Sequence, residues 1–224
     1  MDDHTLNQPE FAQIKEDLKL YFRNRQKLIS PNFSKVVADV SEFIEAVVRV
    51  GFEAALAQSP AHVRVRPDRP FIEVAEALVD HHIRFVHQTE HEMARKSLLD
   101  TYTHIAGPGY ALKPTTKTRF VHALRRSNPS KFAALVLSLY LYNRLSVRIQ
   151  DDPPRSLRDA KSLELYLLNV EGICRDVIAN AVKVRGTAVD EKWVTAVIRD
   201  VETELLGPRS RSAKSLSLLT PTRT

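Results

Sequence analysis

Apolar residues recur at three- and four-residue steps along nearly the whole chain, which is the spacing of amphipathic helices. Residues 63–66 alternate like a short strand, but an isolated strand has no partner to pair with. We therefore expect an all-α protein, folded as an irregular bundle of about seven helices. The expected helices cover residues 9–28, 33–57, 71–105, 115–127, 130–150, 156–184 and 191–206.

Capping and helix-breaking residues separate the expected helices from one another. Pro31 follows Ser30, and Pro129 follows Asn128, so each pair predicts a capped helix start with proline in the first turn. Residues 132–142 form an apolar run too short to span a bilayer, and we expect them to form the buried central helix. Residues 1–207 are expected to form a single helical domain with a possible subdivision near 106–114, followed by a disordered basic tail at 208–224.

Composition narrows the class of protein further. The 224 residues are 43% hydrophobic and 27% charged, which is typical of a globular chain with a substantial core. Only six glycines are present, and this disfavours glycine-rich nucleotide-binding folds. A single cysteine excludes an internal disulfide framework and favours the cytoplasm or another reducing compartment. The first twenty residues show no secretory signal pattern, and we expect no membrane partner.

The positive charge is concentrated in two parts of the chain. The net charge is +6, yet residues 1–100 and 151–207 each carry −3. Residues 101–150 contain eight basic groups and no carboxylate, and residues 208–224 contain four basic groups and none acidic. Such asymmetry points to an anionic partner, of which nucleic acid is the commonest and an acidic protein surface the next.

The short helix expected at 115–127 lies inside this basic stretch. Its Phe120, Val121 and Leu124 can face inward, so that basic side chains project outward beside serine, threonine and asparagine donors. The helix that follows is too apolar for a recognition helix, which favours contact with backbone phosphates over base reading. Alternatively, acidic helices of the same fold neutralise part of the stretch. The candidate nucleic-acid-binding residues are Lys113, Lys117, Arg119, Arg125, Arg126, Lys131, Arg144, Arg148, Arg209 and Arg211.

One motif suggests a different chemistry. His87, Glu90 and His91 match H-x-x-E-H, in which two histidines one helical turn apart bind Zn²⁺ while the glutamate acts as a base. Both histidines, however, fall on a polar stripe of the expected 71–105 helix, which argues against a metal site.

The remaining candidates for chemistry are weak. Cys174 lies among apolar helical residues and is interpreted as a packed core residue. His82 falls on the apolar face of its helix, where a hydrogen-bonded core histidine is the expected role. We find neither a nucleophile elbow nor a phosphate-binding glycine loop, and we expect no cofactor.

The sequence thus favours a non-catalytic helical subunit that binds nucleic-acid backbone without strong sequence preference, within a larger assembly. A protein–protein adaptor with no nucleic-acid role is the first alternative. A zinc-dependent hydrolase that uses the H-x-x-E-H motif is the second.

Overall fold

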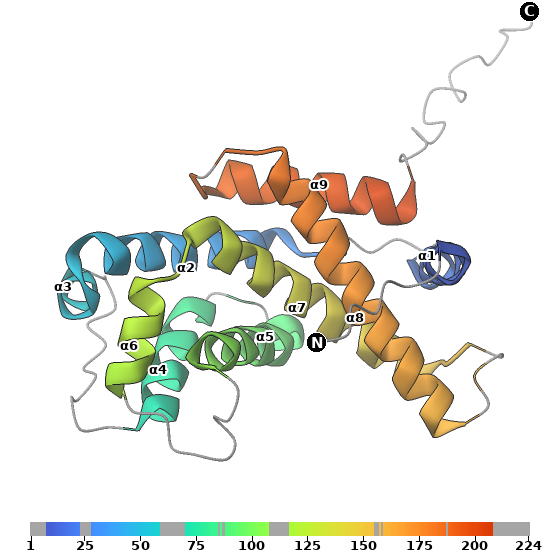
Figure 1. Cartoon of the computed structure of the whole chain (residues 1–224), viewed down its shortest axis with the longest axis horizontal. Helices are drawn as coiled ribbons and strands as arrows, with labels where there is room; N and C mark the ends of the chain where they lie inside the picture. The colour runs from blue at the N-terminus through green and yellow to red at the C-terminus, as the bar shows by residue number, and fades with distance from the viewer. Residues whose placement is uncertain are drawn as a thin grey trace, which may run out of the picture.

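The computed structural model describes residues 8–22, 28–58, 70–84, 86, 88–107, 117–154, 157, 159–186 and 188–207. In these residues the chain is all-helical, as the apolar spacing predicts, and no strand is present (Figure 1). The possible strand at 63–66, most of the 106–114 loop and the basic tail lie outside the described residues. The helices are α1 (Gln8–Phe22), α2 (Pro31–Val50), α3 (Phe52–Gln58), α4 (Phe71–Ile83), α5 (Gln88–Ala106), α6 (Lys117–Arg125), α7 (Pro129–Asp151), α8 (Ala160–Lys183) and α9 (Glu191–Leu206).

Nine helices stand in the described residues where about seven are expected, because two expected helices are each broken once. Residues 33–57 divide into α2 and α3 at Gly51, whose φ of 90° is the left-handed region that glycine adopts readily. Residues 71–105 divide into α4 and α5, and Arg95 on α5 lies 3.3 Å from Asp80 and 3.4 Å from Glu76 on α4. In one straight helix, Glu76 and Arg95 would be about 28 Å apart. The chain therefore folds back between α4 and α5.

The predicted helix starts are confirmed by their capping contacts. Ser30 caps α2 by accepting the amide of Phe33, with Pro31 next in the chain. Asn128 Oδ1 accepts the backbone amides of Ser130 and Lys131 at the start of α7. These side chains satisfy amides that a helix N-terminus leaves unpaired.

Helix α7 is the central helix of the bundle. It packs against α2, α5 and α8, and Figure 1 shows it running between them. By length and composition alone α7 would be able to cross a membrane, but 61% of its most apolar window is buried inside the fold. The expectation that residues 132–142 form a buried core segment is confirmed.

Phe120 anchors the short helix α6 in the core. Its ring centroid lies 4.6 Å from that of Phe71 on α4, 5.5 Å from that of Tyr102 on α5 and 6.5 Å from that of Phe52 on α3. Leu124, one turn further along α6, is also fully buried. The inward face predicted for this helix is therefore confirmed at Phe120 and Leu124, and Val121 is partly buried against the same core.

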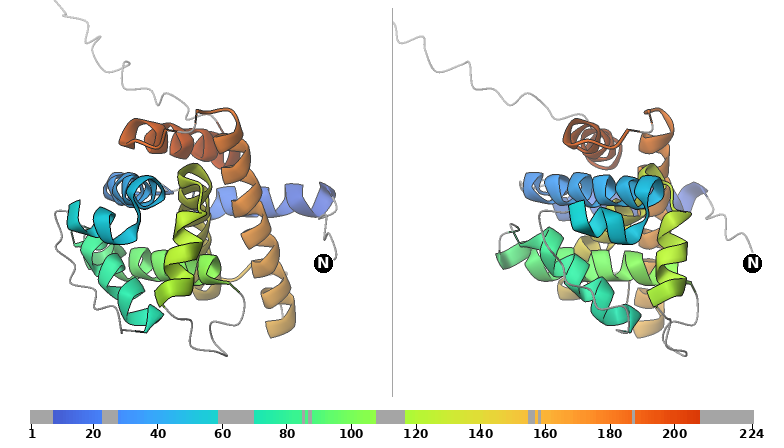
Figure 2. Two further views of the ribbon diagram at one scale, coloured as in Figure 1. Left: turned by 60° about the vertical axis from the view of Figure 1, so that its left-hand side comes forward. Right: turned by 90° about the vertical axis from the view of Figure 1, so that its left-hand side faces the viewer.

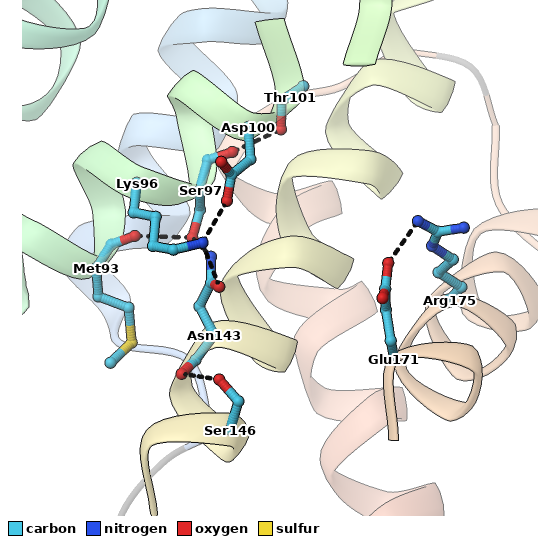
Figure 3. A network of polar contacts seen from close by, with 9 residues as sticks. All are labelled: Met93, Lys96, Ser97, Asp100, Thr101, Asn143, Ser146, Glu171 and Arg175. Atoms are coloured by element: carbon cyan, nitrogen blue, oxygen red, sulfur yellow. Dashed lines mark hydrogen bonds and ion pairs between the residues drawn. The ribbon is translucent and has the colours of Figure 1, made fainter. Parts of the chain in front are cut away.

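A polar network joins α5 to α7 within the apolar bundle (Figure 3). Asn143 Nδ2 donates to Ser97 Oγ at 3.0 Å, and Lys96 Nζ donates to Asn143 Oδ1 at 3.1 Å. Ser97 Oγ in turn donates to the carbonyl of Met93. Each buried polar group drawn into the network thus has a partner, and the pairing sets how α5 and α7 meet.

The two ends of the described chain meet at α9, which lies across α2 and α8 and also contacts α1 (Figures 1 and 2). The buried carboxylate of Glu202 on α9 accepts the backbone amide of Leu28 at 3.1 Å. Lys15 on α1 pairs with Glu204 at 2.9 Å. The first and last helices are therefore held to the same side of the bundle.

Candidate nucleic-acid interface

The turn between α6 and α7 presents three of the candidate cations. Arg125 is the last residue of α6, Arg126 follows it, and Lys131 lies in the first turn of α7. All three are exposed, because the buried Phe120 and Leu124 fix the opposite side of α6 against the core. Within the described part of the chain, neither Arg126 nor Lys131 has an ion pair or side-chain hydrogen bond. We call Arg125, Arg126 and Lys131 the α6–α7 corner.

Two arginines of α6 also lie at the carboxyl ends of neighbouring helices. Nη2 of Arg125 lies 3.4 Å from the place where a Cβ on Gly51 would stand, at the end of α2. Nη2 of Arg119 lies 3.7 Å from the corresponding position at Gly107, directly after α5. A cation at a helix C-terminus stabilises the helix dipole by about 0.3–1 kcal/mol. Arg119 and Arg125 are therefore expected to stabilise the carboxyl ends of α5 and α2, whether or not they also contact a ligand.

Arg144 and Arg148 lie away from the corner, further along α7. Lys131 and Arg144 are thirteen residues apart, a rise of about 20 Å along the helix. The Arg144 side chain is only 12% exposed, and its guanidinium pairs with Glu90 at 3.6 Å. Burial, together with repulsion from Arg144, lowers the pKa of Arg148 from its usual value. The fold thus neutralises Arg144 with its own carboxylate, as the alternative interpretation of the basic stretch anticipates.

Four candidate side chains are not placed. Lys113, Arg209 and Arg211 lie outside the described residues, and Lys117 is described only as the first residue of α6. The α6–α7 corner is therefore the part of the predicted interface in which the structure brings exposed candidate cations together.

The residues of the H-x-x-E-H motif have other neighbours. His87 lies outside the described residues, Glu90 pairs with Arg144, and Nδ1 of His91 lies 3.9 Å from Glu92. Among the residues that the structure describes, no group of three or more histidine, cysteine or acidic side chains is arranged to hold a metal ion.

A cleft that sequence reasoning missed lies between α2, α3 and α4. It encloses about 450 Å³, within the size range of small-molecule sites. Phe43, Ala55 and His82 contribute buried side chains to its lining, while Asp39 and Glu42 stand exposed at its edge. On the sequence the two carboxylates are typical of a solvated helix face, so no pattern marks them as part of a site.

His82 is buried as predicted, but its expected hydrogen bond is missing from the described part of the chain. The residue is 7% exposed, and its Nε2 has no hydrogen-bond partner among the residues described. Burial lowers the pKa of His82 to about 3, and the charges of His81 and Arg84 act in the same direction. The imidazole is neutral at pH 7, and leaving a buried polar atom unpaired costs about 1–3 kcal/mol.

The pKa of Asp39 is shifted in the opposite direction, upward from its usual value. Burial raises the pKa of its carboxyl above the usual value of 3.8, and repulsion from Glu42 and Glu191 adds to the effect. Lys35 and Arg84 attract the carboxylate, but not enough to reverse the direction. Partial loss of solvation is therefore the main reason why the carboxyl of Asp39 holds its proton more tightly than usual.

Comparison with known proteins found no matching family model, no similar curated protein and no similar solved structure.

Proposed function

We propose that this protein is a non-catalytic helical subunit that binds the phosphate backbone of nucleic acid through the α6–α7 corner. The supporting observation is that Arg126 and Lys131 are exposed on a rigidly anchored turn without an internal acidic partner in the described residues. No carboxylate occurs in the sequence from 101 to 150 to compete with a phosphate. Lys113, Lys117 and the tail cations Arg209 and Arg211 extend this surface in the proposal.

The proposed contact is electrostatic and carries little sequence preference. Phosphate contacts position a protein on a duplex, whereas base edges supply specificity. The corner offers cations at the start of a helix, with Asn128 already engaged in capping. Binding should therefore depend steeply on salt and only weakly on sequence.

The test is a salt titration of affinity for a generic DNA duplex, an RNA duplex and a single strand. Each phosphate contact on B-DNA contributes a slope of about 0.9 in log K against log salt. Arg126→Ala/Lys131→Ala should weaken binding to all sequences alike and reduce the slope on duplex DNA by about 1.8.

The matched control is Lys161→Ala/Lys192→Ala, which removes two exposed cations from α8 and α9. This pair should leave both affinity and slope unchanged. Absence of binding at low salt, or equal slopes for the two double variants, would remove the proposal.

A protein–protein adaptor is the second candidate function, and exposed apolar side chains on α8 favour it. Leu165 and Leu168 are 54% and 56% exposed, and the first half of α8 extends beyond the other helices (Figures 1 and 2). A partner segment with an apolar stripe would cover them. A partner that still binds after nuclease treatment, and binds the purified protein but not Leu165→Lys/Leu168→Lys, would support this function.

A further inference from the structure

The first half of α8 carries apolar side chains on its solvent-facing side. Leu165 and Leu168 are 54% and 56% exposed, whereas Tyr166 and Leu167 are turned into the bundle and are less than a tenth exposed. Exposed or half-exposed positions recur on this side at alternating steps of four and three residues, and we call them the α8 seam: Lys161, Leu165, Leu168, Gly172 and Arg175. An average step of 3.5 residues is the repeat of a helix that pairs lengthwise with another helix.

The charges around the α8 seam match a reversed copy of the same helix. Lys161 lies four residues before Leu165, and Glu171 lies three residues after Leu168. The two leucines therefore have a cation towards one end of the helix and a carboxylate towards the other. When a second α8 lies antiparallel, with each Leu165 opposite Leu168 of the other copy, each Lys161 comes within one helical turn of the other copy's Glu171. Gly172 then faces Lys161 and adds no side chain that would hold the two helices apart.

Other arrangements of two copies lack this match. A parallel pair in register would place Lys161 beside Lys161 and Glu171 beside Glu171, and like charges repel. Within its own chain Glu171 pairs with Arg175 at 2.5 Å, and its side chain is still 25% exposed. Its carboxylate has two oxygens, so it can accept a second cation.

We propose that α8 pairs antiparallel with α8 of a second copy of this chain, with Leu165 against Leu168 at the centre and Lys161 beside Glu171 at each end. The two-fold symmetry forms every contact twice. Because only two leucines of each copy are covered, the expected dimer is weak and reversible, with a dissociation constant of about 0.1–1 mM.

The proposal does not rest on nucleic-acid binding, since the α8 seam shares no residue with the α6–α7 corner. At micromolar concentration such a protein is monomeric, so nucleic-acid titrations report on the single chain. For the exposed leucines that favour the adaptor function, the proposal names one partner, which is the chain itself.

Sedimentation equilibrium of the purified full chain, without nucleic acid, tests self-association between about 10 μM and about 1 mM. The average mass of the wild type should rise from 25.4 kDa towards twice that value. Leu165→Lys/Leu168→Lys should stay at the mass of one chain throughout. Lys192→Glu reverses an exposed cation on α9 and is the control, which should associate like the wild type.

Charge reversal tests the antiparallel geometry. Lys161→Glu brings two carboxylates together at each end of the pair, and Glu171→Lys brings two ammonium groups together. Each single variant should therefore associate about fivefold or more weakly than the wild type. The double variant Lys161→Glu/Glu171→Lys exchanges the charges and should recover the wild-type dissociation constant. Melting temperatures are measured in parallel, because Glu171 also pairs with Arg175 in its own chain.

A wild type that remains monomeric up to about 1 mM, or a dimer that persists in Leu165→Lys/Leu168→Lys, would overturn the proposal. Unchanged association in both single charge variants, or no recovery in the double variant, would overturn the antiparallel register. If the protein is monomeric and the leucine variant instead loses a purified partner protein, the α8 seam belongs to that partner and not to a second copy.

Discussion

At the scale of single residues, His82 shows how burial decides a side chain's chemistry. Helical spacing places it on the apolar face of α4, and the structure buries it there beside Phe43. Helical spacing does not predict which groups lie within hydrogen-bond distance of the imidazole, because such groups come from other helices. The unpaired Nε2 therefore emerges only from the folded chain.

Stability should fall with acid because His82 must remain neutral in the folded state. The ordinary pKa is 6.5 and the folded value is about 3, so the stability is complete above pH 6.5 and is lost as the pH falls toward 3. The expected slope is about 1.4 kcal/mol per pH unit in that window. Urea unfolding from pH 7 to 4 should show this component in the wild type and not in His82→Phe. Parallel curves for the two proteins would contradict the burial argument.

The contribution of Asp39 to stability should depend on pH in the opposite direction to that of His82. Because its pKa is raised in the folded state, the ionised carboxylate destabilises the fold at neutral pH, and protonation relieves that effect. Asp39→Asn should therefore raise the melting temperature at pH 7, by an amount that shrinks as the pH falls through the folded pKa and vanishes below 3.8. Asp176→Asn, at an exposed position on α8, is the control and should leave the melting temperature unchanged. A lower melting temperature for Asp39→Asn at pH 7 would mean that its carboxylate has a stabilising partner.

At the scale of elements, the break between α2 and α3 depends on Gly51. A side chain at φ 90° is strained, and a Cβ there would also stand 3.4 Å from Nη2 of Arg125. Gly51→Ala should lower the free energy of unfolding by about 1–2 kcal/mol in urea titrations. Gly186→Ala is the matched control, since no atom stands within 4 Å of its Cβ position and its φ is not in the left-handed region. Equal losses in the two variants would show that Gly51 carries no special strain.

Helix starts were predictable because their signals are local. Asn128 with Pro129, and Asp190 before α9, each place a cap next to the helix that it serves. The breaks at Gly51 and after Ile83 were not predicted, because the apolar spacing continues across them. What establishes the second break is a contact between distant residues, from Arg95 to Glu76 and Asp80.

In the candidate site, too, the features set by local helical spacing were predictable and those set by contacts between helices were not. The inward positions of Phe120 and Leu124 followed from helical spacing, and with them the exposure of Arg125 and Arg126. The pairing of Arg144 with Glu90 could not be predicted, because it joins two helices whose packing is a property of the whole core. The cleft at Asp39 is likewise formed by three helices and has no signature in any one of them.

At the scale of the whole molecule, the residues before α2 are joined to the last helix by a buried contact. Glu202 is 9% exposed and accepts the backbone amide of Leu28. Glu204, two residues further along α9, pairs with Lys15 and has a far more exposed side chain. A buried amide that loses its acceptor is costly, while an exposed ion pair contributes little. The two glutamates therefore offer a matched pair of variants for asking whether the chain folds as one unit.

Glu202→Ala should lower the free energy of unfolding by about 1–3 kcal/mol, and Glu204→Ala by less than about 1 kcal/mol. Residues 1–207 are predicted to form one domain, so fluorescence of Trp193, the only tryptophan, should report the same urea midpoint as far-UV circular dichroism. In Glu202→Ala both midpoints should move together, because α9 packs on α1, α2 and α8 and cannot leave without exposing the core that they share. If the tryptophan signal shifts to lower urea while the helical signal stays in place, α9 unfolds separately and the single-domain prediction is wrong.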